Sequence, residues 1–122
     1  YPHQKELLKD GRLIISDIKR QSLLIYDVFG SFIMEINDSK MQTPKGIGIS
    51  PDGVVFVADP EAGEVFMVDL NLKIINSLKI QGGEKLKNPK DVALFKDSKG
   101  LTKMYILDDD QVIIGLLTEK QE

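Results

Sequence analysis

The sequence predicts an all-β fold made of a repeated antiparallel unit. Three segments of the chain align from a proline to an aspartate, and the first two keep one offset of 42 residues throughout. Each repeat holds short apolar runs rich in β-branched and aromatic residues, which are typical of strands and too short for buried helices. The aligned segments are residues 2–17, 44–59 and 89–108.

Each repeat is expected to contribute two strands up to its closing aspartate. The first strand follows the proline, at residues 47–49 and 92–95, whereas residues 3–8 of the first repeat fit a strand or a helix equally. The second strand ends near the aspartate and covers residues 13–15, 54–57 and 104–107. Asp10-Gly11 and Asp52-Gly53 predict hairpin turns, because glycine adopts positive φ without steric cost. The third repeat has four additional residues here, around residues 98–103.

Two further strands are expected after the closing aspartate. The third covers residues 23–26, 65–68 and 112–117, and the fourth covers residues 32–36 and 74–80. Gly46 and Gly48 alternate with isoleucine in the first strand of the second repeat, which predicts that this strand packs closely against a neighbour. A meander of four short strands that recurs every ~40 to 50 residues is the signature of a propeller blade.

The repeats therefore predict about three four-stranded antiparallel blades of a β-propeller. Their approximate limits are residues 2–37, 44–80 and 89–122, and the last blade is incomplete because the chain stops before its fourth strand. Three blades cannot close a ring, and an open ring exposes apolar faces and strand edges. Three interpretations stay open: a piece of a longer propeller, which a start at Tyr1 rather than Met favours; two copies that complete a six-bladed ring; or a different subunit that supplies the rest.

The second repeat resembles the NHL repeat. Residues 44–59 follow the pattern P-x-G-I-x-I-x-x-D-G-x-V-F-V-A-D, and the next apolar run closes on Val68-Asp69. The first repeat departs from this pattern with Glu6-Leu7-Leu8 in place of Gly-Ile, and the third departs by its insertion and by the lack of a closing Val-Asp. The resemblance implies a β-propeller of NHL type, usually with six blades. It also implies ligand binding on one face of the ring and an extracytoplasmic location, periplasmic or secreted.

The amino-acid composition argues against several kinds of site and partner. The chain of 122 residues has no cysteine and one histidine, His3, which argues against disulfides, thiolate metal sites and His-based catalysis. Its net charge of −3 argues against nucleic acid as the main partner, since phosphate binding needs clustered positive charge. No apolar run approaches the roughly 18 to 20 residues of a membrane-spanning helix.

Acidic residues recur where the second strand meets the third. Asp17, Asp59 and Asp108 are predicted to be structural turn residues whose carboxylates accept backbone N–H groups, although a ligand touching several blades could use them instead. No cofactor is expected, and the alternative is a divalent cation such as Ca²⁺ on the run Asp108-Asp109-Asp110, because Ca²⁺ prefers oxygen ligands. Asn88 and Asp91 could lie near a central channel, but two candidates do not make a metal site.

The sequence favours a non-catalytic propeller segment that acts as an interaction scaffold for a protein partner. Function in this fold depends on loops carried by the blades. Two alternatives come from the resemblance: part of a metal-dependent propeller lyase or lactone hydrolase whose catalytic residues lie mostly on missing blades, and an RNA-binding NHL domain. No catalytic or metal-ligating residue is predicted. The residues expected to bind the partner are Lys19, Arg20, Glu61, Asp109 and Asp110.

Overall fold

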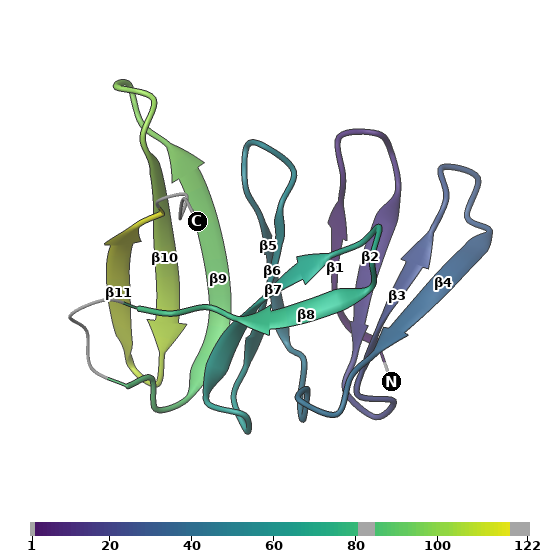
Figure 1. Ribbon diagram of the computed structural model, residues 1–122, viewed down its shortest axis with the longest axis horizontal. Coiled ribbons are helices and arrows are strands. Elements are labelled where there is room, and N and C mark those ends of the chain that lie inside the picture. The colour runs from purple at the N-terminus through teal and green to yellow at the C-terminus, as the bar shows by residue number, and fades with distance from the viewer. Residues whose placement is uncertain (1, 81–84, 118–122) are drawn as a thin grey trace.

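The computed structural model describes residues 2–80 and 85–117, with side chains from residue 4 onward. These residues form eleven β-strands in three antiparallel sheets, which stand side by side as separate blades (Figure 1). The all-β prediction is confirmed. In the part of the chain that the structure describes, no helix is long and apolar enough to span a membrane.

The first sheet has the strand order β1-β2-β3-β4. Residues 3–8, for which a helix was the open alternative, belong largely to β1, because Lys5 and Leu7 pair with Ile15 and Leu13 of the next strand. The strand state of this segment therefore depends on its partner rather than on its own pattern. The strands are β1 (Pro2–Leu7), β2 (Leu13–Asp17), β3 (Ser22–Tyr26) and β4 (Phe32–Asn37).

The second sheet repeats this order with β5-β6-β7-β8. Its last strand is shorter than predicted and ends at Ser77 rather than near Ile80. The N–H of Leu78 still bonds to the carbonyl of Val65 at 2.8 Å, after which Leu78 and Ile80 pack against the core between the second and third sheets. The strands are β5 (Gly46–Ile49), β6 (Val55–Asp59), β7 (Glu64–Asp69) and β8 (Ile74–Ser77).

The third sheet has the order β11-β10-β9, and within the described residues it has no fourth strand. The four additional residues lengthen its first hairpin, since β9 and β10 extend to eight and seven residues and turn at Gly100 with φ of 83°. The Asp-Gly turns of the other two sheets also have the predicted geometry, with φ of 92° at Gly11 and 89° at Gly53. The strands are β9 (Pro89–Lys96), β10 (Thr102–Asp108) and β11 (Gln111–Leu116).

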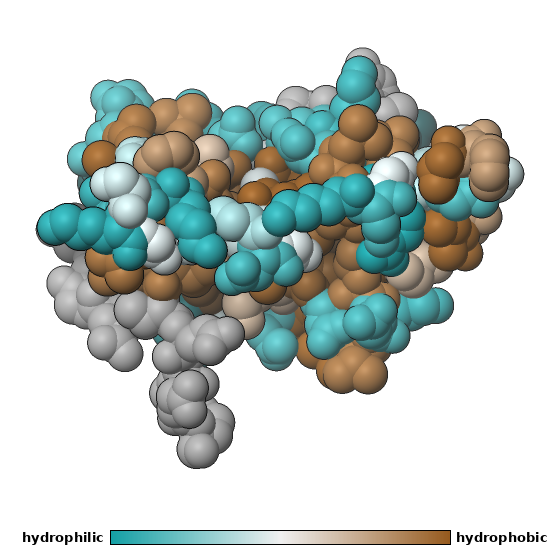
Figure 2. All heavy atoms as spheres, turned by 90° about the horizontal axis from the view of Figure 1, so that it is seen from above, coloured by the Kyte–Doolittle hydropathy of each residue, from teal (hydrophilic) through white to brown (hydrophobic). Residues whose placement is uncertain are grey.

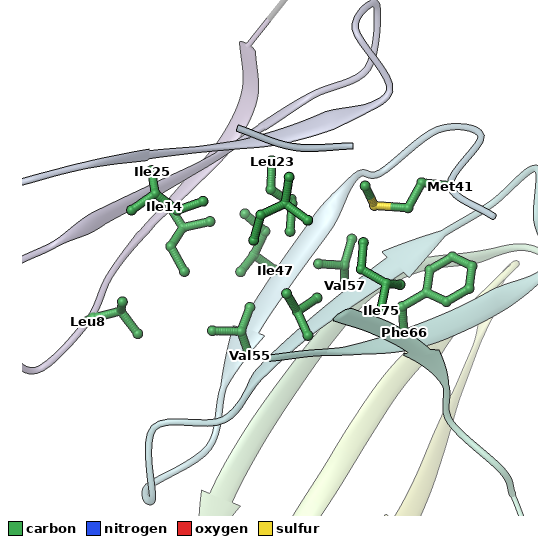
Figure 3. Packing of buried hydrophobic residues seen from close by; sticks show 12 residues of the cluster. Leu8, Ile14, Leu23, Ile25, Met41, Ile47, Val55, Val57, Phe66 and Ile75 are labelled. Carbon is green, nitrogen blue, oxygen red and sulfur yellow. The ribbon is translucent and has the colours of Figure 1, made fainter. Parts of the chain in front are cut away.

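The core lies between the sheets rather than within any one of them. Ile14, Leu23 and Ile25 of the first sheet face Val57 and Phe66 of the second, and all five are buried (Figure 3). The opposite face of the second sheet packs on the third through a separate cluster. The second sheet is therefore apolar on both faces, which explains the continuous apolar run in β6. The second cluster contains Phe56, Ala58, Val65, Leu86, Val92, Met104 and Ile106.

The first strands of neighbouring sheets approach one another closely. A Cβ atom on Gly46 would lie 2.5 Å from Cα of Asp91 and 2.7 Å from the carbonyl oxygen of Lys90. A Cβ atom on Gly48 would lie 2.6 Å from the carbonyl oxygen of Val92. Neither distance leaves room for a side chain, so the predicted close packing of this strand is confirmed.

Candidate interaction face

The second strand of each sheet ends in a buried aspartate. Asp59 accepts hydrogen bonds from the backbone N–H groups of Gln42 at 2.8 Å and Thr43 at 2.9 Å, which belong to the segment entering the second sheet. The same carboxylate accepts bonds from the Thr43 hydroxyl at 3.1 Å and from the N–H of Ala62 at 3.0 Å. Its side chain thus fastens the incoming segment to the turn between β6 and β7.

Asp108 makes the equivalent bonds in the third sheet. It accepts the N–H of Asn88 at 2.7 Å and the N–H of Lys87 at 3.0 Å, both from the segment that enters β9. The prediction placed such bonds inside the loop that follows the aspartate. The structure shows such a bond from the N–H of Ala62 to Asp59, but further donors of Asp59 and Asp108 come from the linker about 16 to 21 residues earlier, a pairing that only the folded chain creates.

Asp17 holds the corresponding place in the first sheet. It accepts the N–H of Arg20 at 3.2 Å, and the Arg20 guanidinium approaches its carboxylate to 3.6 Å. Burial alone would raise the pKa of Asp17, but the surrounding hydrogen bonds and positive charges, those of Arg20 among them, lower that pKa below its ordinary value. The carboxylate is therefore held in its charged form.

The turns that follow these aspartates lie at one end of the three sheets (Figure 1, lower edge). We call them the interaction face: the β2–β3, β6–β7 and β10–β11 turns. All five residues predicted to bind a partner lie on these turns and are exposed. Positive charge lies on the first sheet and negative charge on the other two. The residues are Lys19 and Arg20, then Glu61, then Asp109 and Asp110.

Two residues that sequence reasoning did not single out support this face. The Thr43 hydroxyl accepts the N–H of Glu61 at 3.1 Å while it donates to Asp59, so it links the segment that enters the second sheet to the β6–β7 turn. Gln21 in the β2–β3 turn has φ of 54°, and its amide nitrogen donates to the carbonyl of Gln42 at 3.0 Å. In the repeat alignment the residue that matches Gln21 is Gly63, which has φ of 70° in the structure. A glycine at this place was the available signal that the turn needs a positive φ.

Asn88 and Asp91, the two residues expected near a central channel, contact different parts of the structure. Asn88 accepts the N–H of Asp109 through its carbonyl at 3.0 Å, whereas Asp91 accepts the N–H of Val92 at 2.9 Å and lies against β5.

The inner wall of the three sheets forms an open hollow of about 460 Å³ across β1, β5 and β9, with Glu6 and Lys9 as its charged lining residues. Among residues 2–80 and 85–117, no three His, Cys, Asp or Glu side chains gather as a metal ion would require. The side chain of His3 lies outside the described residues.

Comparison with known proteins places the fold in a class. No protein-family model matches the chain, and no curated protein matches it. Solved structures do match at low sequence identity. A catalytically inactive virginiamycin B lyase from Staphylococcus aureus with quinupristin superposes with a TM-score of 0.65 at 10% identity, over 93% of this chain and 40% of that one.

Two further solved structures give similar scores. Hydrazine synthase from Kuenenia stuttgartiensis matches with a TM-score of 0.66 at 18% identity, over 88% of this chain and 32% of that one. A proposed gluconolactonase matches with a TM-score of 0.61 at 19% identity, over 96% and 44%. The fold and these likenesses define the chain as a partial β-propeller. It spans less than half the length of each of these three chains.

Proposed function

We propose that this chain is an NHL-type propeller segment that binds a protein partner through the interaction face, without catalysis and without a cofactor. The observation that supports the proposal is the placement of five exposed charged side chains at one end of three sheets. The rigid backbone of these turns also supports the proposal, because the buried aspartates beneath them hold the backbone in place.

The charge pattern specifies the kind of partner surface. Lys19 and Arg20 on the first sheet would face acidic groups, while Glu61, Asp109 and Asp110 on the others would face basic groups. A partner with a matching division of charge would be attracted and oriented along the row of sheets, since complementary charge contributes mainly to association rate and specificity.

The test is a cross-linking pull-down from an extract of the source cells with three versions of the chain. The first is unaltered, the second carries Lys19→Glu, Arg20→Glu, Glu61→Lys, Asp109→Lys and Asp110→Lys, and the third carries Asp52→Lys. Asp52 is exposed at the opposite end of the second sheet, and its reversal changes the net charge by the same two units. Circular dichroism confirms folding of each version.

We expect a defined protein to be captured by the unaltered and Asp52→Lys chains and lost with the five-fold variant. Capture of the same proteins by all three versions would refute the role of this face. A loss with both Asp52→Lys and the five-fold variant would show that net charge rather than the interaction face controls binding.

A second candidate function is favoured by the likeness to a virginiamycin B lyase and a proposed gluconolactonase. In that case the chain would be part of a propeller enzyme with most of its catalytic residues on further blades. Elemental analysis and a lactone hydrolysis assay, both on a protein that carries this chain together with the further blades, distinguish the two. Stoichiometric divalent metal or turnover that depends on it would favour the enzyme, and neither is expected for the scaffold.

A further inference from the structure

The two ends of the sheets differ in the side chains that they expose. At the end opposite the interaction face, hydrophobic side chains reach the surface (Figure 2), and Phe29 on the β3–β4 turn is 88% exposed. Among the described residues, no large hydrophobic side chain is exposed on the three turns of the interaction face. A partner of the interaction face would therefore be recognised mainly through charge.

The charges of the interaction face are divided between its two sides. Lys19 and Arg20 place two positive charges on the first sheet, and Asp109 and Asp110 place two negative charges on the third. Glu61 lies between them on the second sheet, which has a neighbouring sheet on both of its faces. Glu61 is exposed all the same, so a neighbouring sheet leaves the turns at this end uncovered.

Hydrogen bonds hold the backbone on both sides of the interaction face. The N–H of Arg20 donates to the carboxylate of Asp17 at 3.2 Å, and the N–H of Asp109 donates to the carbonyl of Asn88 at 3.0 Å. The Arg20 guanidinium also approaches Asp17, yet the side chain of Arg20 stays 61% exposed. The fold therefore sets where the two groups of opposite charge lie.

We propose that the partner of the interaction face is a second copy of this chain, turned so that its row of sheets runs in the opposite direction. In a contact with a two-fold axis the same patch serves both copies, and each kind of residue pair occurs twice. Lys19 and Arg20 of each copy then face Asp109 and Asp110 of the other. The chain itself thus carries the reversed charge pattern that this face requires. This inference rests on the proposed function, because it uses the same face.

Glu61 distinguishes this arrangement from a partner of another kind. Because it lies on the middle sheet, Glu61 would face its own counterpart near the two-fold axis, and two carboxylates repel each other. Glu61→Gln should therefore strengthen the association of two copies. In a complex that pairs Glu61 with a basic group of a different protein, the same change should weaken binding.

Sedimentation equilibrium at low ionic strength tests the proposal with four versions of the chain. The first is unaltered, the second carries Lys19→Glu and Arg20→Glu, the third carries Asp109→Lys and Asp110→Lys, and the fourth carries all four changes. For the unaltered chain we expect a dimer of about 27 kDa, twice the single-chain mass of 13.7 kDa. Added salt should dissociate it, because exposed ion pairs are weak and are screened by salt. Circular dichroism confirms the folding of each version.

The second and third versions should each associate about tenfold more weakly, or weaker still, because like charges then face each other. The fourth version should recover most of the loss. An equimolar mixture of the second and third versions should form a mixed dimer, since opposite charges meet again on both sides. General repulsion does not account for the loss expected in the third version, because its net charge changes from −3 to +1. Lys19→Glu alone, which leaves Arg20 beside Asp17, should give a smaller loss.

A monomeric unaltered chain at low ionic strength would overturn the proposal. Equal association of all four versions would also overturn it, because self-association would then depend on surfaces outside the interaction face. The pull-down separates this proposal from the proposed function. If the interaction face captures a different protein while these variants leave self-association unchanged, the face binds a partner that is not a second copy.

Discussion

Buried carboxylates are the residues on which the local framework depends. Asp59 is 0% exposed and Asp108 is 2% exposed, yet each is surrounded by backbone N–H donors from the linker that enters its sheet. A carboxylate can accept several such bonds at once, and bonds to a charged acceptor are stronger than neutral ones. The recurrence of aspartate at this position therefore has a structural cause that needs no ligand.

Replacing Asp59 by alanine should lower the free energy of unfolding by about 3 kcal/mol or more. The change leaves the N–H groups of Gln42, Thr43 and Ala62 without their acceptor, and each hydrogen bond to a charged group contributes about 1.5 to 3 kcal/mol. Asp69→Ala is the control, because Asp69 also accepts two backbone N–H groups but is exposed to water. Urea denaturation measures both, and equal losses for the two variants would contradict the interpretation.

At the scale of elements, the first strand of each sheet controls the distance between neighbouring sheets. β5 lies against β9 along Gly46 and Gly48, whose missing side chains allow direct backbone contact. On its other side β5 receives the Gln4 side chain from β1. β5 thus contacts β1 through a hydrogen bond and β9 through close backbone packing. A small side chain added to β5 is therefore expected to disturb the packing of the sheets.

Gly46→Ala should destabilise the protein by about 1 to 3 kcal/mol, the usual cost of overpacking. The added methyl group would meet backbone atoms of Asp91 and Lys90, which cannot move without shifting β9. Gly115→Ala on β11 is the matched control, since its added methyl group meets nothing within 4 Å. Thermal unfolding followed by circular dichroism measures both, and a neutral Gly46→Ala would show that the sheets are not held together at this point.

At the scale of the whole molecule, the second sheet is covered on both faces and the outer sheets on one. Every residue of β6 is buried, whereas β4 and β11 are largely exposed. We expect amide hydrogen exchange to be slowest in β6 and fastest in β4 and β11, because local opening depends on buried contacts. Equal protection in β6 and β11 would contradict this gradient.

Most strand positions and turns could be read from adjacent residues. The Asp-Gly pairs predicted two hairpins, and the apolar runs predicted ten of the eleven strands, because turn geometry and burial are constrained by neighbours in the chain. The five charged residues of the candidate interaction face could likewise be assigned to their turns from the repeat. Their role in binding stays a prediction.

The remaining features depend on residues that are far apart in the sequence. Residues 3–8 carry no pattern that separates strand from helix, and pairing with β2 makes them a strand. The donors that meet Asp59 and Asp108 lie in the preceding linkers, and no local rule connects them. The position of Asp91 against β5 also arises only when the sheets pack. Short-range sterics and alternation encode the elements, whereas long-range pairing and packing decide what each element touches.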